Sequence, residues 1–127
     1  PPFPMFFRTS YGGDRLGPHH LPPGAAVILS PYVTHRLAAH WPNPEDFDPT
    51  RFAVDHAAER PNETYYPFGL GQRLCIGANL SLLEQQVIVA TVAQRFDREL
   101  VSGYVLAPHY DIALRPRNGV PMMLTPR

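Results

Sequence analysis

A dense run of apolar residues between positions 78 and 96 dominates the hydrophobic pattern of the chain. Apolar side chains recur at steps of three and four along this run, which is the spacing of a helix, and they occupy two neighbouring lines. The two lines consist of Leu80, Leu83, Val87 and Ala90, and of Leu82, Ile88, Val92 and Phe96. The pattern predicts a helix over 78–96 whose apolar face is too wide for a surface helix. We therefore expect this helix to be buried on more than one side.

Shorter apolar segments on either side of this helix predict small β elements. Residues 25–30 form a brief apolar run after the turn-forming sequence Leu21-Pro22-Pro23-Gly24, and this pattern predicts a short buried strand. In the tail, Asn118-Gly119 separates residues 111–114 from residues 122–124. Because this dipeptide favours the tight turns of hairpins, we expect the two tail segments to pair with each other.

The segment over residues 41–52 is a loop punctuated by prolines. It carries Trp41, Phe47 and Phe52, which we expect to attach the loop to a core. Its carboxylates lack the spacing of a calcium-binding loop, so we interpret them as solvated. These carboxylates are Glu45, Asp46 and Asp48.

Composition and charge narrow the classes of function. The 127 residues include 16 prolines, and the formal net charge is zero. No basic block appears, so we do not expect nucleic-acid binding. No segment approaches the length of a membrane-spanning helix and no secretory signal is visible, so we expect a cytoplasmic protein, with an anchor in preceding sequence still open. The prolines and the apolar helix also predict exposed apolar surface on the chain by itself.

The one cysteine of the chain, Cys75, follows a glycine-rich loop and stands just before the predicted helix. A lone cysteine cannot form an internal disulfide, and with no second cysteine beside it no site of the zinc-finger type can be built. Three interpretations remain, namely a buried structural thiol, a nucleophile and a single thiolate ligand to a metal.

The residues around Cys75 favour the ligand. The N-terminus of a helix stabilises a thiolate through its unpaired N–H groups and its dipole. Glycines let a flat group approach the main chain, Arg73 offers a fork of donors to a carboxylate, and Phe68 can pack on a planar partner. The glycines are Gly69, Gly71 and Gly77. Together these features suit a haem with its propionates, and an iron held by one thiolate gains electron density that favours O–O cleavage.

A dinucleotide-binding loop is the alternative for the same glycines, since Gly69-x-Gly71 begins like one. The third glycine of that fingerprint would fall at position 74, where this chain has Leu74. The preceding Tyr65-Tyr66-Pro67 is also a poor parallel strand. We therefore reject this interpretation.

The run from Phe68 to Gly77 resembles the haem-binding loop of the cytochrome P450 family, whose pattern is Phe-x-x-Gly-x-Arg-x-Cys-x-Gly. All fixed positions match, and they are Phe68, Gly71, Arg73, Cys75 and Gly77. In the helix that follows, Glu84 matches the family, whereas Ser81 stands where alanine is usual. Residues 41–52 are similar to the family segment that precedes the loop, and residues 1–8 to a stretch that passes over the haem.

The resemblance implies a mainly α fold with small β hairpins, the C-terminal part of the P450 fold, in which the axial-cysteine loop leads into a long buried helix. Residues 1–127 would then be a C-terminal fragment of a single P450 domain. The part with the oxygen-binding helix would lie upstream of this chain. The thiolate side of the haem site is thus expected in this sequence and the oxygen side outside it.

The resemblance also implies roles for individual residues. Cys75 would be the proximal ligand to the iron of haem b (iron protoporphyrin IX), and Arg73 and Arg8 would bind its propionates. Phe68 would shield the thiolate side. The glycines Gly69, Gly71 and Gly77 would shape the loop. Two further residues would have structural roles, Arg51 by pairing with an upstream glutamate–arginine couple, and Glu84.

The function implied for the parent protein is that of a haem-thiolate monooxygenase. It would take electrons from a ferredoxin or flavoprotein reductase, activate dioxygen and oxidise a small apolar substrate. Met5, Phe6, Phe7 and residues 117–120 would form pocket walls. We expect the fragment alone to be inactive. A peroxygenase or isomerase is a close relative, and a non-enzymatic haem-binding or inert truncated remnant and a structural module with a buried Cys75 are the remaining alternatives.

Overall fold

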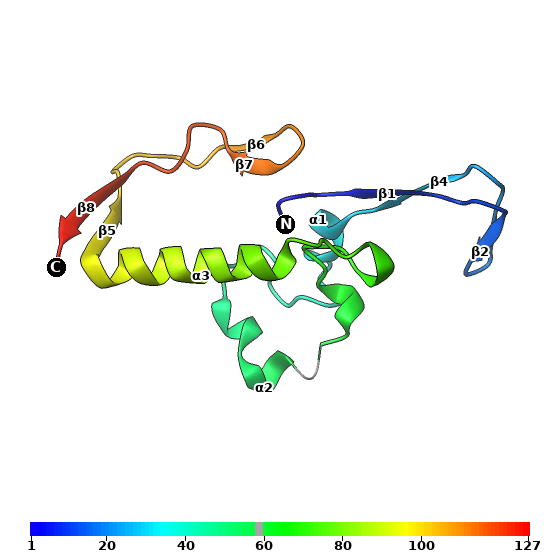
Figure 1. Ribbon diagram of the computed structural model, residues 1–127, viewed down its shortest axis with the longest axis horizontal. Coiled ribbons are helices and arrows are strands. Elements are labelled where there is room, and N and C mark those ends of the chain that lie inside the picture. The colour runs from blue at the N-terminus through cyan, green and yellow to red at the C-terminus, as the bar shows by residue number, and fades with distance from the viewer. Residues whose placement is uncertain (58–59) are drawn as a thin grey trace. The chain divides into compact units, whose positions relative to one another are not determined.

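The computed structural model describes residues 1–57 and 60–127 (Figure 1). The chain divides into two compact units. The first unit comprises Pro1 and Phe3–Gly69, and the second comprises Pro2 and Leu70–Arg127.

The first unit begins with two short antiparallel ladders. Strand β1 (Phe6–Thr9) pairs with β4 (Ala26–Leu29), with Phe6 opposite Leu29, and β2 (Asp14–Leu16) pairs with β3 (His19–Leu21) between them in sequence. Gly17 joins β2 to β3 with φ +58°, a backbone conformation that glycine adopts without steric cost. The strand predicted over residues 25–30 is therefore present, but most of β4 is exposed rather than buried. A two-stranded ladder covers neither of its own faces, which explains the exposure.

Short helical turns follow, and each begins where the sequence supplies a cap. Helix α1 (Pro31–Thr34) starts after Ser30, whose hydroxyl accepts a hydrogen bond from the amide of Val33. The 3-10 helix η1 (Pro49–Phe52) starts after Asp48, whose carboxylate accepts from the amide of Thr50 at 2.9 Å. Both have proline in the first turn, where a missing N–H costs nothing. Helix α2 (Val54–Ala57) and the 3-10 helix η2 (Asn62–Thr64) complete this unit.

An aromatic cluster forms the core of the first unit. Trp41 is 5% exposed, and its ring centroid lies 6.2 Å from that of Phe52 and 5.8 Å from that of Tyr65. The expectation that Trp41 and Phe52 attach the 41–52 loop to a core is confirmed. The same expectation for Phe47 is wrong, because its side chain is 95% exposed.

The second unit contains the longest helix. The 3-10 helix η3 (Gly71–Arg73) leads to α3 (Ala78–Arg95), which runs directly into β5 (Phe96–Leu100) (Figure 1). Strand β5 pairs antiparallel with the last strand, β8 (Met122–Pro126). An ion pair between Arg127, just after β8, and Asp97 of β5 joins the end of this ladder, with 2.7 Å between Nη2 and Oδ1. Strands β6 (Pro108–Tyr110) and β7 (Leu114–Pro116) form a separate ladder. Among the described residues, no helix combines the length and the apolar character needed to cross a membrane.

The expectation of a mainly α fold is wrong for this chain. Helices, α and 3-10 together, account for 28% of the residues and strands for 24%. Most helical segments have only three or four residues, and several strands have only three, too few for a periodic pattern to show in the sequence.

The expectation of a long buried helix is wrong as well. Ala78 is the buried residue of α3, whereas Leu83 is 58% exposed and Ile88 is 61% exposed. The wide apolar face predicted from the sequence exists, and its side chains are exposed in the described part of the chain. The helix also ends at Arg95, because Phe96 already has extended backbone in β5.

The tail forms a turn where it was predicted but pairs differently. Gly119 has φ +71°, and its amide donates to the carbonyl of Pro116. Residues 114 and 122 on either side are not partners, because β7 pairs with β6 and β8 pairs with β5. The hairpin predicted between the two tail segments is therefore wrong, and the turn instead connects two different ladders.

Candidate functional site

The glycine-rich loop before Cys75 has the backbone shape that its glycines permit. Gly69 has φ +80° and Gly71 has φ +66°, both in the left-handed region that other residues rarely adopt. The amide of Leu74 donates to the carbonyl of Gly71 at 3.1 Å, which closes the turn of η3. A Cβ at position 71 would meet nothing within 4 Å, so the backbone angle and not crowding requires glycine there.

Cys75 is free and exposed at the N-terminus of α3. Its carbonyl accepts from the amide of Ala78 at 3.2 Å, and Gly77, the N-cap residue, accepts from the amide of Ser81 at 2.9 Å. A Cβ on Gly77 would lie 3.9 Å from Sγ of Cys75, so this glycine lies against the sulfur. The chain thus presents one exposed thiol at the N-terminal end of an 18-residue helix.

The donor set around this thiol fits a haem better than a metal ion held by protein ligands alone. Within residues 1–57 and 60–127, no group of three or more His, Cys, Asp and Glu side chains could hold a metal ion together. A single exposed thiol can supply one axial ligand to an iron whose other ligands come from a macrocycle. Arg73, at the end of η3, is exposed and can receive a carboxylate.

The remaining predicted haem contacts belong to the first unit. Phe68 is half-buried and Gly69 is buried, with the amide of Gly69 donating to the carbonyl of Tyr66 at 3.1 Å. Arg8 lies exposed on β1 and donates to the carbonyl of Phe7 at 2.8 Å. The other predicted haem contacts belong to the second unit, and they are Gly71, Arg73, Cys75 and Gly77.

Two residues predicted to be structural have different surroundings. Arg51 donates to the carbonyls of Pro42 and Asn43, the latter at 2.8 Å, and forms an ion pair with Asp48 at 3.7 Å. Its guanidinium therefore ties together both ends of the 41–52 loop. Hydrogen bonds from the Thr50 hydroxyl and amide, together with Arg51, hold the pKa of Asp48 below its ordinary value. Glu84 is exposed on α3.

Comparison with known proteins agrees with this geometry. The family model described as Cytochrome P450 matches residues 1–119. The chain belongs to the cytochrome P450 family. Cyclooctatin synthase of Streptomyces melanosporofaciens is 37% identical over 114 residues, which cover 90% of this chain and 25% of that protein. The probable cytochrome P450 4aa1 of Drosophila melanogaster is 34% identical and covers 100% of this chain and 25% of its own length.

Solved P450 structures share the fold. The retinoic acid-bound cyanobacterial CYP120A1 superposes with a TM-score of 0.92 at 30% sequence identity, over 100% of this chain and 29% of that one. The haem domain of cytochrome P450DA gives a TM-score of 0.90 at 25% identity. The chain spans about a quarter of the length of the curated relatives it matches.

Sequence reasoning missed two residues of this P450 chain. The ring of His35 lies 4.7 Å from that of Tyr65, and its Nε2 accepts a hydrogen bond from the amide of Tyr66 at 2.9 Å. Burial, which has the largest effect, and the positive charge of Arg36 lower the pKa of His35 from 6.5 to about 4. No pattern in the sequence predicts the hydrogen bond between His35 and Tyr66, because the two residues are 31 positions apart.

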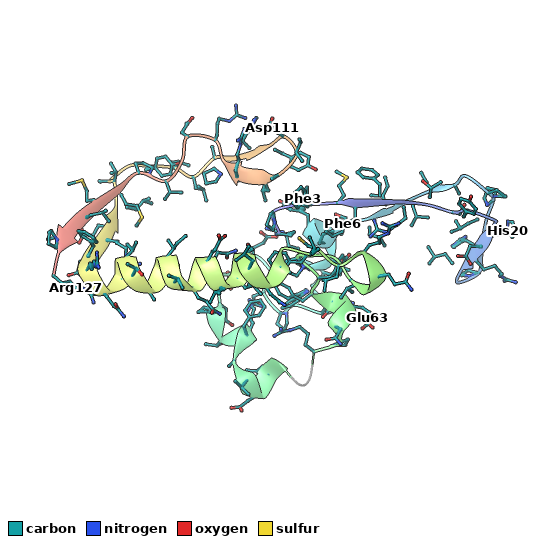
Figure 2. The ribbon with its side chains drawn as sticks, in the orientation of Figure 1. Phe3, Phe6, His20, Glu63, Asp111 and Arg127 are labelled. Carbon is teal, nitrogen blue, oxygen red and sulfur yellow. The ribbon has the colours of Figure 1, made fainter. Side chains whose placement is uncertain are left out.

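Arg60 is the second missed residue. Its guanidinium lies 5.0 Å from the ring centroid of Trp41 and 4.8 Å from that of Phe52, so it covers the aromatic cluster by cation–π contact. The ring of Phe6, which β1 carries and Figure 2 labels, lies 6.5 Å from the ring of Tyr66. A guanidinium packed on aromatic rings stabilises them through both charge and contact area.

Proposed function

We propose that this chain provides the axial-ligand part of a haem-thiolate monooxygenase. The observation that carries the proposal is the exposed thiol of Cys75 at the N-terminus of α3, within a loop that matches the family pattern at every fixed position. Haem b held there would supply the chemistry of dioxygen activation.

The chain's own residues would bind and shield the group. Cys75 would ligate the iron through its sulfur, from its position at the N-terminus of α3. Arg73 and Arg8 would donate to the propionates, and Phe68 would keep water from the thiolate face. Gly69, Gly71 and Gly77 would keep side chains out of the space beside the ring. In support, Gly71 has open space where a Cβ would stand, and Gly77 lies beside the sulfur.

The structural residues would hold this part of the enzyme together. Arg51 would support the 41–52 loop, in keeping with its hydrogen bonds to two loop carbonyls. We also propose that it pairs with a glutamate–arginine couple elsewhere in the enzyme. Glu84, which is exposed on α3, would have a structural role in the whole enzyme.

The activity would belong to the whole protein, because the chain corresponds to about a quarter of its relatives. We propose a ferredoxin or flavoprotein reductase as electron donor, dioxygen as oxidant and a small apolar organic molecule as substrate. The apolar side chains of Met5, Phe6 and Phe7 support an apolar pocket, and one solved relative is bound to retinoic acid. A cytoplasmic location is also part of the proposal, since one unpaired thiol suits a reducing compartment.

Titration of the chain with haem, followed by Soret absorbance and electron paramagnetic resonance, tests the proposal. We expect a low-spin thiolate signal that disappears in Cys75→Ser and persists in Met123→Leu, which removes a different exposed sulfur of the same unit. Arg73→Gln should weaken haem binding by about tenfold, as loss of an exposed charge-assisted hydrogen bond predicts, whereas Arg98→Gln should not. Equal spectra for Cys75→Ser and the unsubstituted chain would contradict the assignment of the ligand.

A further inference from the structure

His35 makes a hydrogen bond that determines its protonation state. The amide of Tyr66 donates to Nε2 of His35 at 2.9 Å. A backbone N–H can only donate, so Nε2 must be the unprotonated nitrogen and the ring must be neutral. Protonation would place an N–H of the ring against the N–H of Tyr66, and the hydrogen bond would be lost.

Tyr66 is held at three points, and the hydrogen bond to His35 is one of them. Its phenol oxygen lies 2.8 Å from Oγ1 of Thr34, the residue before His35. Its ring stands edge-on to the ring of His35, with centroids 5.4 Å apart. The end of α1 therefore fixes both the main chain and the side chain of Tyr66.

Tyr66 in turn fixes the first residues of the predicted haem loop. Its carbonyl accepts from the amide of Gly69 at 3.1 Å, which closes a turn around Pro67 and Phe68. Tyr66 thus links His35 to this turn, because its amide donates to His35 and its carbonyl accepts from Gly69. Gly69 is the last residue of the first unit and is buried. An anchor lost at His35 would therefore loosen the turn that carries Phe68.

Burial favours the neutral form of His35. It lowers the pKa of His35 to about 4, and the positive charge of Arg36 acts in the same direction. Tyr65 and Tyr66 contribute neutral phenols. A hollow of about 260 Å³ beside the ring is also lined by charged side chains of both signs, which are Asp46, Asp48 and Arg51.

We propose that neutral His35 is a positioning residue for the haem loop: by accepting the amide of Tyr66 it holds the turn Tyr66–Gly69 in place, and its protonation releases that turn. The position of the turn is a property of the chain alone. Its consequence for haem rests on the proposed function.

The test follows two probes along a pH series from 7 to 3.5. Trp41 is the one tryptophan of the chain, and its ring lies 6.4 Å from that of His35, so a protonated imidazole should quench its emission. The second probe is the protection of the Tyr66 and Gly69 amides against hydrogen exchange. It is expressed as a protection factor, because this ratio corrects for the intrinsic pH dependence of exchange. We expect both probes to change together with a midpoint near pH 4.

Three variants at one position separate titration from packing. His35→Gln keeps an acceptor and cannot titrate, so it should retain protection at pH 7 and lose the transition. His35→Leu has no acceptor, so protection of Tyr66 and Gly69 should fall by about tenfold at pH 7, the value of one net hydrogen bond. His35→Asn offers a shorter acceptor and should give partial protection.

His40→Gln and His56→Gln are matched controls. Both histidines line a second hollow, on which Trp41 also borders, and neither contacts Tyr66 in the described residues. Both should keep the transition. A transition that persists in His35→Gln, or Gly69 protection that is unchanged in His35→Leu, would overturn the proposal.

Haem affinity gives a separate readout. If the unsubstituted chain binds haem, His35→Leu should bind it several-fold more weakly while His35→Gln binds it equally, and equal binding by both would overturn the positioning role. If the unsubstituted chain binds no haem, the proposed function fails, and the protection of Gly69 still decides whether His35 holds the turn.

Discussion

Replacing Trp41 with alanine should open the first unit more than any other single truncation of its aromatic side chains. Trp41 is 5% exposed and contacts the rings of Phe52 and Tyr65. Arg60 also lies over its face at 5.0 Å. The substitution would remove the centre of the cluster on which the 41–52 loop packs.

The expected loss of unfolding free energy follows from one cost and two effects that reduce it. Truncation of a buried tryptophan typically costs about 3–5 kcal/mol. Two of its neighbours, Phe52 and Tyr65, are 49% and 39% exposed, so the site can collapse and the lower value applies. Nε1 of Trp41 is buried without a hydrogen-bond partner in the described part of the chain, and its removal relieves a desolvation penalty of about 1 kcal/mol. The net destabilisation should be about 2 kcal/mol, which is roughly a 30-fold increase in the opening constant.

Hydrogen exchange of the amides between residues 30 and 66 measures this opening directly, without requiring two-state unfolding of the whole chain. Trp41→Phe keeps a ring and removes the unpartnered N–H, so it should cost less than about 1 kcal/mol. Phe47→Ala is the control, since Phe47 is 95% exposed and its truncation should change little. The reasoning would be refuted if Trp41→Ala cost no more than Phe47→Ala, or if Trp41→Phe cost as much as Trp41→Ala.

Three further predictions concern pH, the glycine loop and the 41–52 loop. The folded chain lowers the pKa of His35 from 6.5 to about 4, so the stability that neutral His35 contributes is complete above pH 6.5 and is lost as the pH falls toward 4. After allowance for solvent screening, we expect the free energy of unfolding to fall by about 1–2 kcal/mol over this range. Urea denaturation in a pH series measures this loss, and a flat profile would contradict the prediction. Gly71→Ala should destabilise the second unit by about 1–2 kcal/mol because φ at this residue is +66°. Gly77→Ala should change the stability by less than about 0.5 kcal/mol, because φ at Gly77 is −85°. Hydrogen exchange of the α3 amides compares the two variants, and equal effects would refute the backbone argument. Arg51→Lys should increase exchange in the 41–52 loop by about tenfold. The reason is that the single ammonium nitrogen of lysine does not reproduce the planar fork whose two nitrogens, Nη1 and Nη2, donate to the two loop carbonyls. Arg98→Lys is the neutral control.

Local signals in the sequence predicted several features well. The apolar periodicity located α3, and the loop glycines fall where positive φ is observed, at Gly69 and Gly71. Trp41 and Phe52 form the expected core contact. In each case the signal and the structure lie within a few residues, so that a short pattern was enough.

Features that depend on distant partners could not be predicted. The pairing of β5 with β8 joins residues 96 and 126, and no turn residue marks it, so the nearer turn at Gly119 suggested the wrong hairpin. The anchor of Tyr66 on His35 also joins distant positions and leaves no periodic trace. The burial of α3 failed for a different reason: periodicity shows that a face is apolar, and only the surrounding chain determines whether that face is covered.

The central claim is that Cys75 ligates a haem iron, and the reduced carbon-monoxide difference spectrum tests it most directly. The spectrum should be recorded on the haem-loaded chain and on Cys75→Ser, with Met123→Leu as the sulfur control. We predict a strongly red-shifted Soret band in the unsubstituted chain and in Met123→Leu, and its loss in Cys75→Ser. A red-shifted band that persists in Cys75→Ser, or no such band in any of the three proteins, would contradict the account.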